Sequence, residues 1–350
     1  MSDTQTIIKT KPSLLKRLVN YIGCIVIVLS LLFNFYLIVA VASLQGDNVN
    51  RAIVKDGQEE SIVAAFKIEG VINAETAARF NEFYHAVHKD KAVKAILLRV
   101  DSPGGTVSAS EQIGHQIGKL KKAGKKIVIS MGAVAASGGY LISANADHIV
   151  AENSTITGSI GVVAPIPNCS ALMEKLGVKM QYIKSSDARV WKDMLNPFRA
   201  PQKFELDRMI SILNQMQTSF NAIVKNGRGD KLKLEKEIVT ISSINEKGEI
   251  VEKQIEQTAP LNGKIYTAIE AKKFGLIDQI GFEDTAIEVA CKLAGNPNSK
   301  VIRYSFESTA DLLRAIIFGK SSLPKVATEF IDANTKVRFM MIWNPTLFSK

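Results

Sequence analysis

The sequence has few of the residues that build metal sites and disulfide frameworks. Its 350 residues include only three cysteines and four histidines. No two cysteines form a C-x-x-C pair, and Cys24 lies inside an apolar run, which argues against a disulfide framework. His85 and His88 share one face of an expected helix, but no third ligand is evident. We therefore expect no bound metal.

The sequence is also poor in aromatic residues, which make up 7% of the chain, although its formal net charge is +10. Lysines and arginines are scattered, and neither zinc-finger spacing nor an RNA-recognition motif occurs. An excess of positive charge of this kind indicates a solvated basic surface or attraction to anionic lipid headgroups. We therefore expect no nucleic-acid partner.

Charged residues are absent between Leu18 and Gly46. The apolar run inside this stretch is long enough to cross the roughly 30 Å hydrocarbon core of a bilayer as a helix. Lysines and an arginine precede it and Asp47 follows it, so the positive-inside bias places the N-terminus in the cytoplasm and the rest outside. We predict a single-pass anchor. A cleaved signal peptide, processed at 40–42, stays open as the alternative.

The part beyond this run is predicted to be one α/β domain. Apolar runs of strand length occupy Ile62–Ile68, Ala95–Val100, Ile127–Ile129 and His148–Ala151. Amphipathic helical patterns occupy 80–87, 113–120, 206–223, 267–274 and 283–294. Such alternation favours a largely parallel sheet with flanking helices. We assign 1–17 to a cytoplasmic tail, 18–45 to a transmembrane helix, 46–60 to a linker, 61–299 to the main domain with a hairpin inserted at 236–257, and 300–350 to a C-terminal segment.

The stretch from Ser130 to Tyr140 has the composition of a turn that presents a nucleophile. A buried strand runs into small residues, which are followed by Ser137 and two glycines. A serine on a sharp turn between small residues can offer its hydroxyl to a substrate carbonyl. The glycines let backbone N–H groups approach the carbonyl oxygen closely, as an oxyanion hole requires. A turn of small residues kept for packing is the alternative.

A serine nucleophile needs a base, and the histidines do not fit this role. In the order of an α/β-hydrolase triad, only His148 follows Ser137, and it begins an expected strand. The reverse order could use His85 or His115 with Asp101, but enzymes of that order are all-β.

A lysine base remains. A lysine amine ordinarily titrates near 10.4, so burial must lower its pKa by roughly two or three units before it accepts a proton at neutral pH. Lys192, within Val190–Leu195, is unusual among the lysines because its neighbours are apolar. It is therefore one candidate base among many lysines, most of which are solvated surface residues.

A second glycine motif, Asp101-Ser-Pro-Gly-Gly105, follows an expected strand and opens a helical pattern. Its proline restricts the turn, and its glycines expose N–H groups where the helix dipole favours negative charge. The motif suits an oxyanion or a phosphate. It lacks the pattern of a P-loop, so we expect no nucleotide.

Five segments in order carry a resemblance to a known family. They are Asp101–Gly105, Ala136–Tyr140, Thr157–Val162, Trp191–Arg199 and Asn262–Asp278. Together they resemble the signal peptide peptidase A family, membrane-anchored serine proteases with a Ser–Lys dyad and a Clp protease/crotonase-like fold. The resemblance covers most of residues 62–295.

The resemblance implies a role for five residues. Ser137 corresponds to the nucleophile and Lys192 to the general base, while Gly104 and Gly138 supply the N–H groups of the oxyanion hole. Ser185 is similar to the family's second serine, which orients the lysine. The chain departs from the family here, because Ser185 and Lys192 lie further apart in the sequence than is usual.

The resemblance also implies a function. It predicts a serine endopeptidase of the bacterial inner membrane that degrades signal peptides or other membrane-derived polypeptides on the periplasmic side. It implies no cofactor, and a homo-oligomeric ring in which neighbouring subunits complete the active site. The atypical insertion at 236–257 could alter the substrate groove or a subunit contact. The alternatives are an inactive scaffold of the same fold, and an acyl-coenzyme A enzyme, which an outward-facing domain would deprive of coenzyme A.

Overall fold

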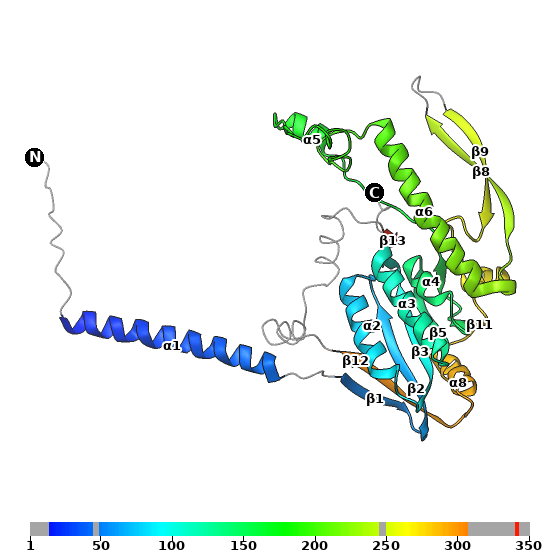
Figure 1. Cartoon of the computed structure of the whole chain (residues 1–350), viewed down its shortest axis with the longest axis horizontal. Coiled ribbons are helices and arrows are strands. Elements are labelled where there is room, and N and C mark those ends of the chain that lie inside the picture. The colour runs from blue at the N-terminus through cyan, green and yellow to red at the C-terminus, as the bar shows by residue number, and fades with distance from the viewer. Residues whose placement is uncertain (1–13, 45–48, 245–249, 307–339, 343–350) are drawn as a thin grey trace, which may run out of the picture.

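The computed structural model of the chain describes residues 14–44, 49–244, 250–306 and 340–342 (Figure 1). The helices are α1 (Leu14–Leu44), α2 (Ala74–Val87), α3 (Val107–Lys122), α4 (Gly138–Ser143), α5 (Ser170–Lys175), α6 (Lys203–Arg228), a 3-10 turn (Gly229–Lys231), α7 (Ala268–Lys273) and α8 (Glu283–Leu293). The strands are β1 (Val49–Lys55), β2 (Gln58–Glu69), β3 (Val93–Ser102), β4 (Gly104–Thr106), β5 (Lys126–Ala136), β6 (His148–Ala151), β7 (Ile156–Gly158), β8 (Glu235–Ile244), β9 (Ile250–Ala259), β10 (Ile265–Thr267), β11 (Gln279–Ile280), β12 (Ser299–Phe306) and β13 (Met340–Ile342).

The central sheet is mostly parallel. Its strand order is β1-β12-β2-β3-β5-β6-β11, and every pair in this path is parallel except the pair of β1 with β12 at the edge. The four predicted strands lie within strands of this architecture, and the five predicted helical patterns lie within its helices apart from one residue at each end of α7 and one at the end of α8. The expected α/β fold with a largely parallel sheet is therefore confirmed.

Alternate residues of the central strands face opposite sides of the sheet. In β2, Ala64 and Phe66 pack with the buried side chains of α2 and α3, whereas Val63 and Ala65 pack against Ala290 of α8. Figure 1 shows α2, α3 and α4 together in front of the sheet. Both faces are covered, which explains why these strands read as continuous apolar runs.

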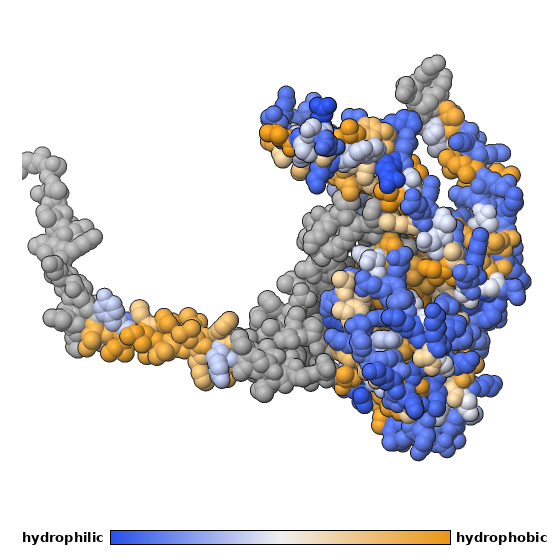
Figure 2. Space-filling model, viewed as in Figure 1, coloured by the Kyte–Doolittle hydropathy of each residue, from blue (hydrophilic) through white to orange (hydrophobic). Residues whose placement is uncertain are grey.

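Helix α1 extends away from the rest of the chain, and Figure 2 shows it as an apolar rod. In the described residues it is the one helix that is long and apolar enough to cross a membrane, through its window Asn20–Leu37, none of which is buried. The predicted apolar helix is thus present.

Two boundaries differ from those predicted. The stretch assigned to a linker, 46–60, contains strand β1 and the start of β2. The segment assigned to a separate C-terminal region, 300–350, begins within β12, which lies between β1 and β2. Edge strand β1 mixes apolar and polar residues and is mostly exposed, so its sequence does not look like a buried strand. Residues 307–339 and 343–350 lie outside the described part of the chain.

The predicted insertion at 236–257 corresponds to the antiparallel pair β8 and β9, in register from Glu235 opposite Ala259 to Ile244 opposite Ile250. The two strands form a separate sheet beside α6 (Figure 1). The residues between the two strands, 245–249, lie outside the described part of the chain.

Candidate active site

Ser137 lies between the end of β5 and the start of α4, on the sharp turn that the sequence predicted. Its backbone has φ 54° and ψ −116°, a region that residues other than glycine rarely adopt. Its N–H donates to the carbonyl of Gly158 at 2.8 Å, and its carbonyl accepts from the N–H of Leu141 at 2.9 Å. These bonds hold the strained turn in place, a combination that often marks functional sites.

Among the described residues, the hydroxyl of Ser137 has one hydrogen bond, a long one to the carbonyl of Gly161 at 3.5 Å. The residue is only 1% exposed. Ser137 is thus held inside the protein, and within the described ranges its hydroxyl has no short hydrogen bond to an acceptor.

The two glycine motifs lie side by side. A Cβ added to Gly139 would lie 2.8 Å from the carbonyl oxygen of Ser102, and helix α4 contacts β4. A Cβ on Gly105 would lie 1.9 Å from the carbonyl oxygen of Ile72. Glycine is required at both positions because backbone approaches backbone there. This packing brings the turn 102–105 next to the turn of Ser137.

The backbone N–H groups of Gly138 and Gly104, the two expected donors of an oxyanion hole, have different hydrogen bonds. Gly138 is the first residue of α4, where an N–H has no partner within the helix. The N–H of Gly104 instead donates to the hydroxyl of Ser102 at 3.1 Å, and the Gly104 carbonyl accepts from the N–H of Ile72 at 2.9 Å. Within the described part of the chain, the Gly138 N–H has no hydrogen bond, whereas the Gly104 N–H is bonded to Ser102.

We expect Gly105→Ala to destabilise the protein by about 1–3 kcal/mol, because the added methyl group forces β4 away from Ile72. Chemical denaturation measures this change. Gly118→Ala in α3 is the matched control, since a Cβ there meets nothing within 4 Å, and we expect it to be neutral or stabilising. Equal stability of the two variants would contradict the tight packing of β4.

Asp101, considered above as a triad member, has a structural role here. Its carboxylate accepts the N–H of Val134 at 3.0 Å and so supports the strand that leads to Ser137. His85 and His88 contact Tyr84 through their rings, and the described residues contain no cluster suited to a metal ion.

Lys192 lies in the turns between α5 and α6, a segment that projects from the sheet in Figure 1. The side chain of Lys192 is exposed, and its backbone N–H donates to the backbone carbonyl of Ala188 at 3.0 Å. Ser185 is also exposed. Among the described residues, no hydrogen bond joins Lys192 to Ser137 or to Ser185. A single chain in this conformation therefore does not form the dyad or the dry pocket that a neutral lysine needs.

A charged network that the sequence did not reveal lies beside Lys192. Asp193 bonds with Lys184 and Arg199, and Arg199 also bonds with Glu205. Hydrogen bonds from Lys184 and Arg199 hold the pKa of Asp193 well below its usual range. The hydrogen bond from Arg199 likewise lowers the pKa of Glu205. The carboxylates of Asp193 and Glu205 are therefore ionised at neutral pH. The only local signal was the charged pattern within Trp191–Arg199.

Strand β13 pairs antiparallel with β4, with Met341 opposite Gly105. An extended stretch of chain therefore lies along the glycine strand next to Ser137. The sequence contained no signal for this pairing, because the two segments are far apart in the chain.

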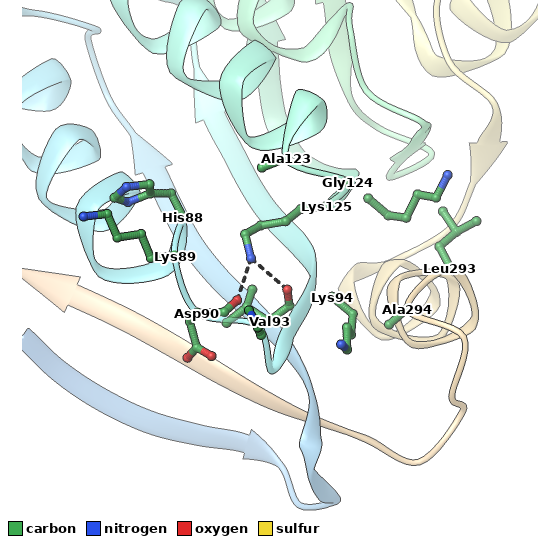
Figure 3. Close-up of a pocket in the computed structure, with 12 residues that line it drawn as sticks. His88, Lys89, Asp90, Val93, Lys94, Ala123, Gly124, Lys125, Leu293 and Ala294 are labelled. Atoms are coloured by element: carbon green, nitrogen blue, oxygen red, sulfur yellow. Dashed lines mark hydrogen bonds between the residues drawn. The ribbon is translucent and has the colours of Figure 1, made fainter.

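The hollow in Figure 3 lies away from Ser137, at the opposite ends of β3 and β5. Its volume is about 450 Å³, and lysines line it. The amine of Lys125 donates to the carbonyls of Asp90 at 2.8 Å and Val93 at 2.9 Å. Helices α2 and α3 both end here, so the lysines complement the negative ends of two helix dipoles. This hollow is explained by the fold and is not the active site.

Residues 119–240 match the family described as peptidase family S49. A protein of Methanocaldococcus jannaschii, provisionally named a protease, is 34% identical over 226 residues, which are 65% of this chain and 64% of that protein. A provisionally named protease of Synechocystis is 32% identical over 265 residues, or 76% of this chain and 86% of that protein. A provisionally named signal peptide peptidase SppA of Enterococcus faecium is 32% identical over 265 residues, or 75% and 68%.

These similarities extend over most of the α/β domain and include the turn of Ser137 and the segment of Lys192 within residues 119–240. They confirm the resemblance that the five sequence segments indicated. The chain belongs to peptidase family S49.

Proposed function

We propose that this chain is a membrane-anchored serine endopeptidase with Ser137 as nucleophile and Lys192 as general base. The observation that carries the proposal is the buried Ser137 on its strained turn, at the start of α4 and beside the second glycine turn. Membership of a peptidase family supports the same assignment.

The proposed reaction follows from these groups. The neutral amine of Lys192 takes the proton of the Ser137 hydroxyl as its oxygen attacks the scissile carbonyl carbon. The N–H of Gly138, joined by that of Gly104, stabilises the oxyanion. The leaving amine takes the proton from Lys192, and water, activated by the same amine, then hydrolyses the acyl-enzyme. Ser185, exposed here, keeps its predicted role in orienting Lys192 as part of this proposal.

An extended polypeptide is the substrate that suits this site. The pairing of β13 with β4 supports this view, because it shows that the edge of the glycine strand accepts an extended, antiparallel backbone. A substrate strand in that position would be recognised through its main chain. Signal peptides and other membrane-derived polypeptides fit this mode, and α1 would keep the site close to them. We propose the inner membrane, with the domain on the periplasmic side, as its location.

A second copy of the chain is proposed to complete the site. The segment that carries Lys192 exposes large apolar side chains, among them Leu176, Trp191 and Ile183, the last 91% exposed. Figure 2 shows apolar residues among polar ones on this projecting part. Several large apolar side chains exposed on one segment favour an interaction site there. In a homo-oligomeric ring, the segment of one subunit could bring Lys192 to Ser137 of its neighbour and exclude water from the amine.

Labelling with a biotinylated fluorophosphonate tests the proposal. We expect the full chain in detergent to react with the probe, and Ser137→Ala to abolish the reaction. Ser108→Ala, at an exposed serine of α3, is the control and should react as the wild type does. An oligomeric wild type that the probe does not modify would instead support the non-catalytic scaffold.

A further inference from the structure

The segment Trp191–Arg199 contains more than the proposed base. Arg199 and Asp193 lie in the family resemblance but take no part in the reaction described above. Residues 178–202 form only turns and irregular chain, and most of them are exposed. Some other contact must therefore hold the backbone next to Lys192.

Arg199 makes those contacts. Its Nη1 and Nη2 donate to the two carboxylate oxygens of Glu205 at 2.7 and 2.5 Å. Its Nη2 also donates to the backbone carbonyl of Asp193 at 3.0 Å, and its Nε donates to the Asp193 carboxylate at 3.3 Å. Planar, forked guanidinium geometry permits all four bonds at once, which the single amine of lysine cannot do.

We call the hydrogen bonds of Arg199 to Asp193 and Glu205 the Arg199 clamp. At Glu205, the clamp is attached to a rigid element. Glu205 is in the first turn of α6, a helix of 26 residues, and is only 2% exposed. Its carboxylate also accepts the N–H of Gln202 at 2.8 Å, which caps the helix. On the far side, Lys184 binds the remaining oxygen of Asp193. The network thus connects the residue next to Lys192 to α6 through two ionic contacts.

We propose that Arg199 is a positioning residue that fixes the backbone at Asp193 to α6, so that Lys192 is presented to Ser137 in one orientation. This inference rests on the proposed function. A misplacement of about 1 Å in a catalytic group can lower the rate of reaction about 100-fold. Loss of the clamp therefore lowers kcat while substrate binding along β4 is retained.

The test compares kcat and KM of Arg199→Gln with those of the wild type, using an unfolded fluorescent polypeptide. We expect kcat to fall about 10- to 100-fold with little change in KM. Arg199→Lys should recover only part of kcat. Arg303→Gln, which breaks a partly buried pair with Glu283 on the opposite side of the domain, is the matched control and should leave kcat unchanged.

A double variant separates positioning from stability. Arg199→Gln leaves the buried carboxylate of Glu205 without its partner, and adding Glu205→Gln removes that charge. If Arg199 acts only through stability, the double variant regains kcat together with its thermal midpoint. If Arg199 positions Lys192, the thermal midpoint recovers and kcat stays low.

Each outcome has a distinct meaning. A kcat of Arg199→Gln within threefold of the wild type, or full recovery in the double variant, overturns the inference while the proposed function stands. Failure of the proposed function would appear differently, as unchanged hydrolysis after removal of Ser137.

Discussion

Replacing Lys192 with methionine is expected to lower kcat for an unfolded polypeptide by about 10²–10⁴-fold, the usual contribution of a positioned general base. Methionine keeps an unbranched side chain but cannot accept a proton. Because Lys192 is exposed and its side chain has no hydrogen bond among the described residues, the substitution should leave stability unchanged. Hydrolysis of a fluorescent polypeptide and a thermal unfolding curve measure the two effects.

Lys179→Met is the matched control, since Lys179 is exposed on the same segment. It should retain wild-type activity.

Mixing two inactive variants tests whether the serine and the lysine of one active site come from the same chain. Chains with Ser137→Ala and chains with Lys192→Met are each inactive alone. If neighbouring subunits share the dyad, co-assembly in equal amounts restores roughly a quarter of the activity, because random neighbours pair one intact serine with one intact lysine that often. No recovery in mixed oligomers would place both groups in one chain.

Replacing Asp278 with alanine is expected to destabilise the domain by about 3–5 kcal/mol, as the loss of one partner of a buried ion pair does. The side chain of Arg228 is fully buried, and its Nη2 donates to Asp278 at 2.9 Å. Asp278 also accepts the N–H of Ile149 in β6 at 2.8 Å. Its removal leaves a buried guanidinium without a counterion and an amide without an acceptor. Urea unfolding measures the loss.

Asp207→Ala is the control, because Asp207 pairs with Lys203 on the exposed surface of α6. A pair of that kind contributes little to stability, so a loss as large as that of Asp278→Ala would contradict the importance of burial.

The carboxylate of Asp278 should also make the stability of the protein depend on pH. Burial by itself would raise the pKa of Asp278, but hydrogen bonds from Arg228 and Lys231 outweigh it and lower the pKa to about 2. A carboxylate with a lowered pKa contributes stability that is present above its unfolded pKa of about 3.9 and is lost as the pH falls toward the folded value. Between about pH 4 and pH 2, the unfolding free energy of the wild type should therefore fall more steeply than that of Asp278→Ala.

Local features of the site were predictable from the sequence because they depend on neighbouring residues. The small residues before Ser137 and the glycines after it specify a sharp turn between a strand and a helix, and the structure contains that turn. The alternation of apolar runs with helical patterns likewise predicted the parallel α/β sheet. The hydrogen bond from Gly104 to Ser102 was not predictable, because the side-chain conformation of Ser102 decides it.

Long-range arrangement was harder to predict. Strand β12 pairs with β2 although more than two hundred residues separate them, and an exposed edge strand, β1, pairs with its other side. The Arg199 clamp brings together Lys184, Asp193 and Glu205. Hydrophobic periodicity predicts buried faces of helices and strands, and it gives no information about which charged residues pair. Pairing of this kind depends on where the backbone passes, which no local pattern records.

The sequence by itself determined the apolar N-terminal helix and the turn that holds Ser137, because each depends on residues adjacent in the chain. It also determined the family and the class of fold, because these depend on the order of short local motifs and apolar patterns along the chain. Only the tertiary structure decided that Lys192 is exposed on a projecting segment, that Arg199 ties this segment to α6, and that β13 lies along β4. Those relations depend on contacts between distant segments, where packing and ion pairing, and not residue order, select the arrangement.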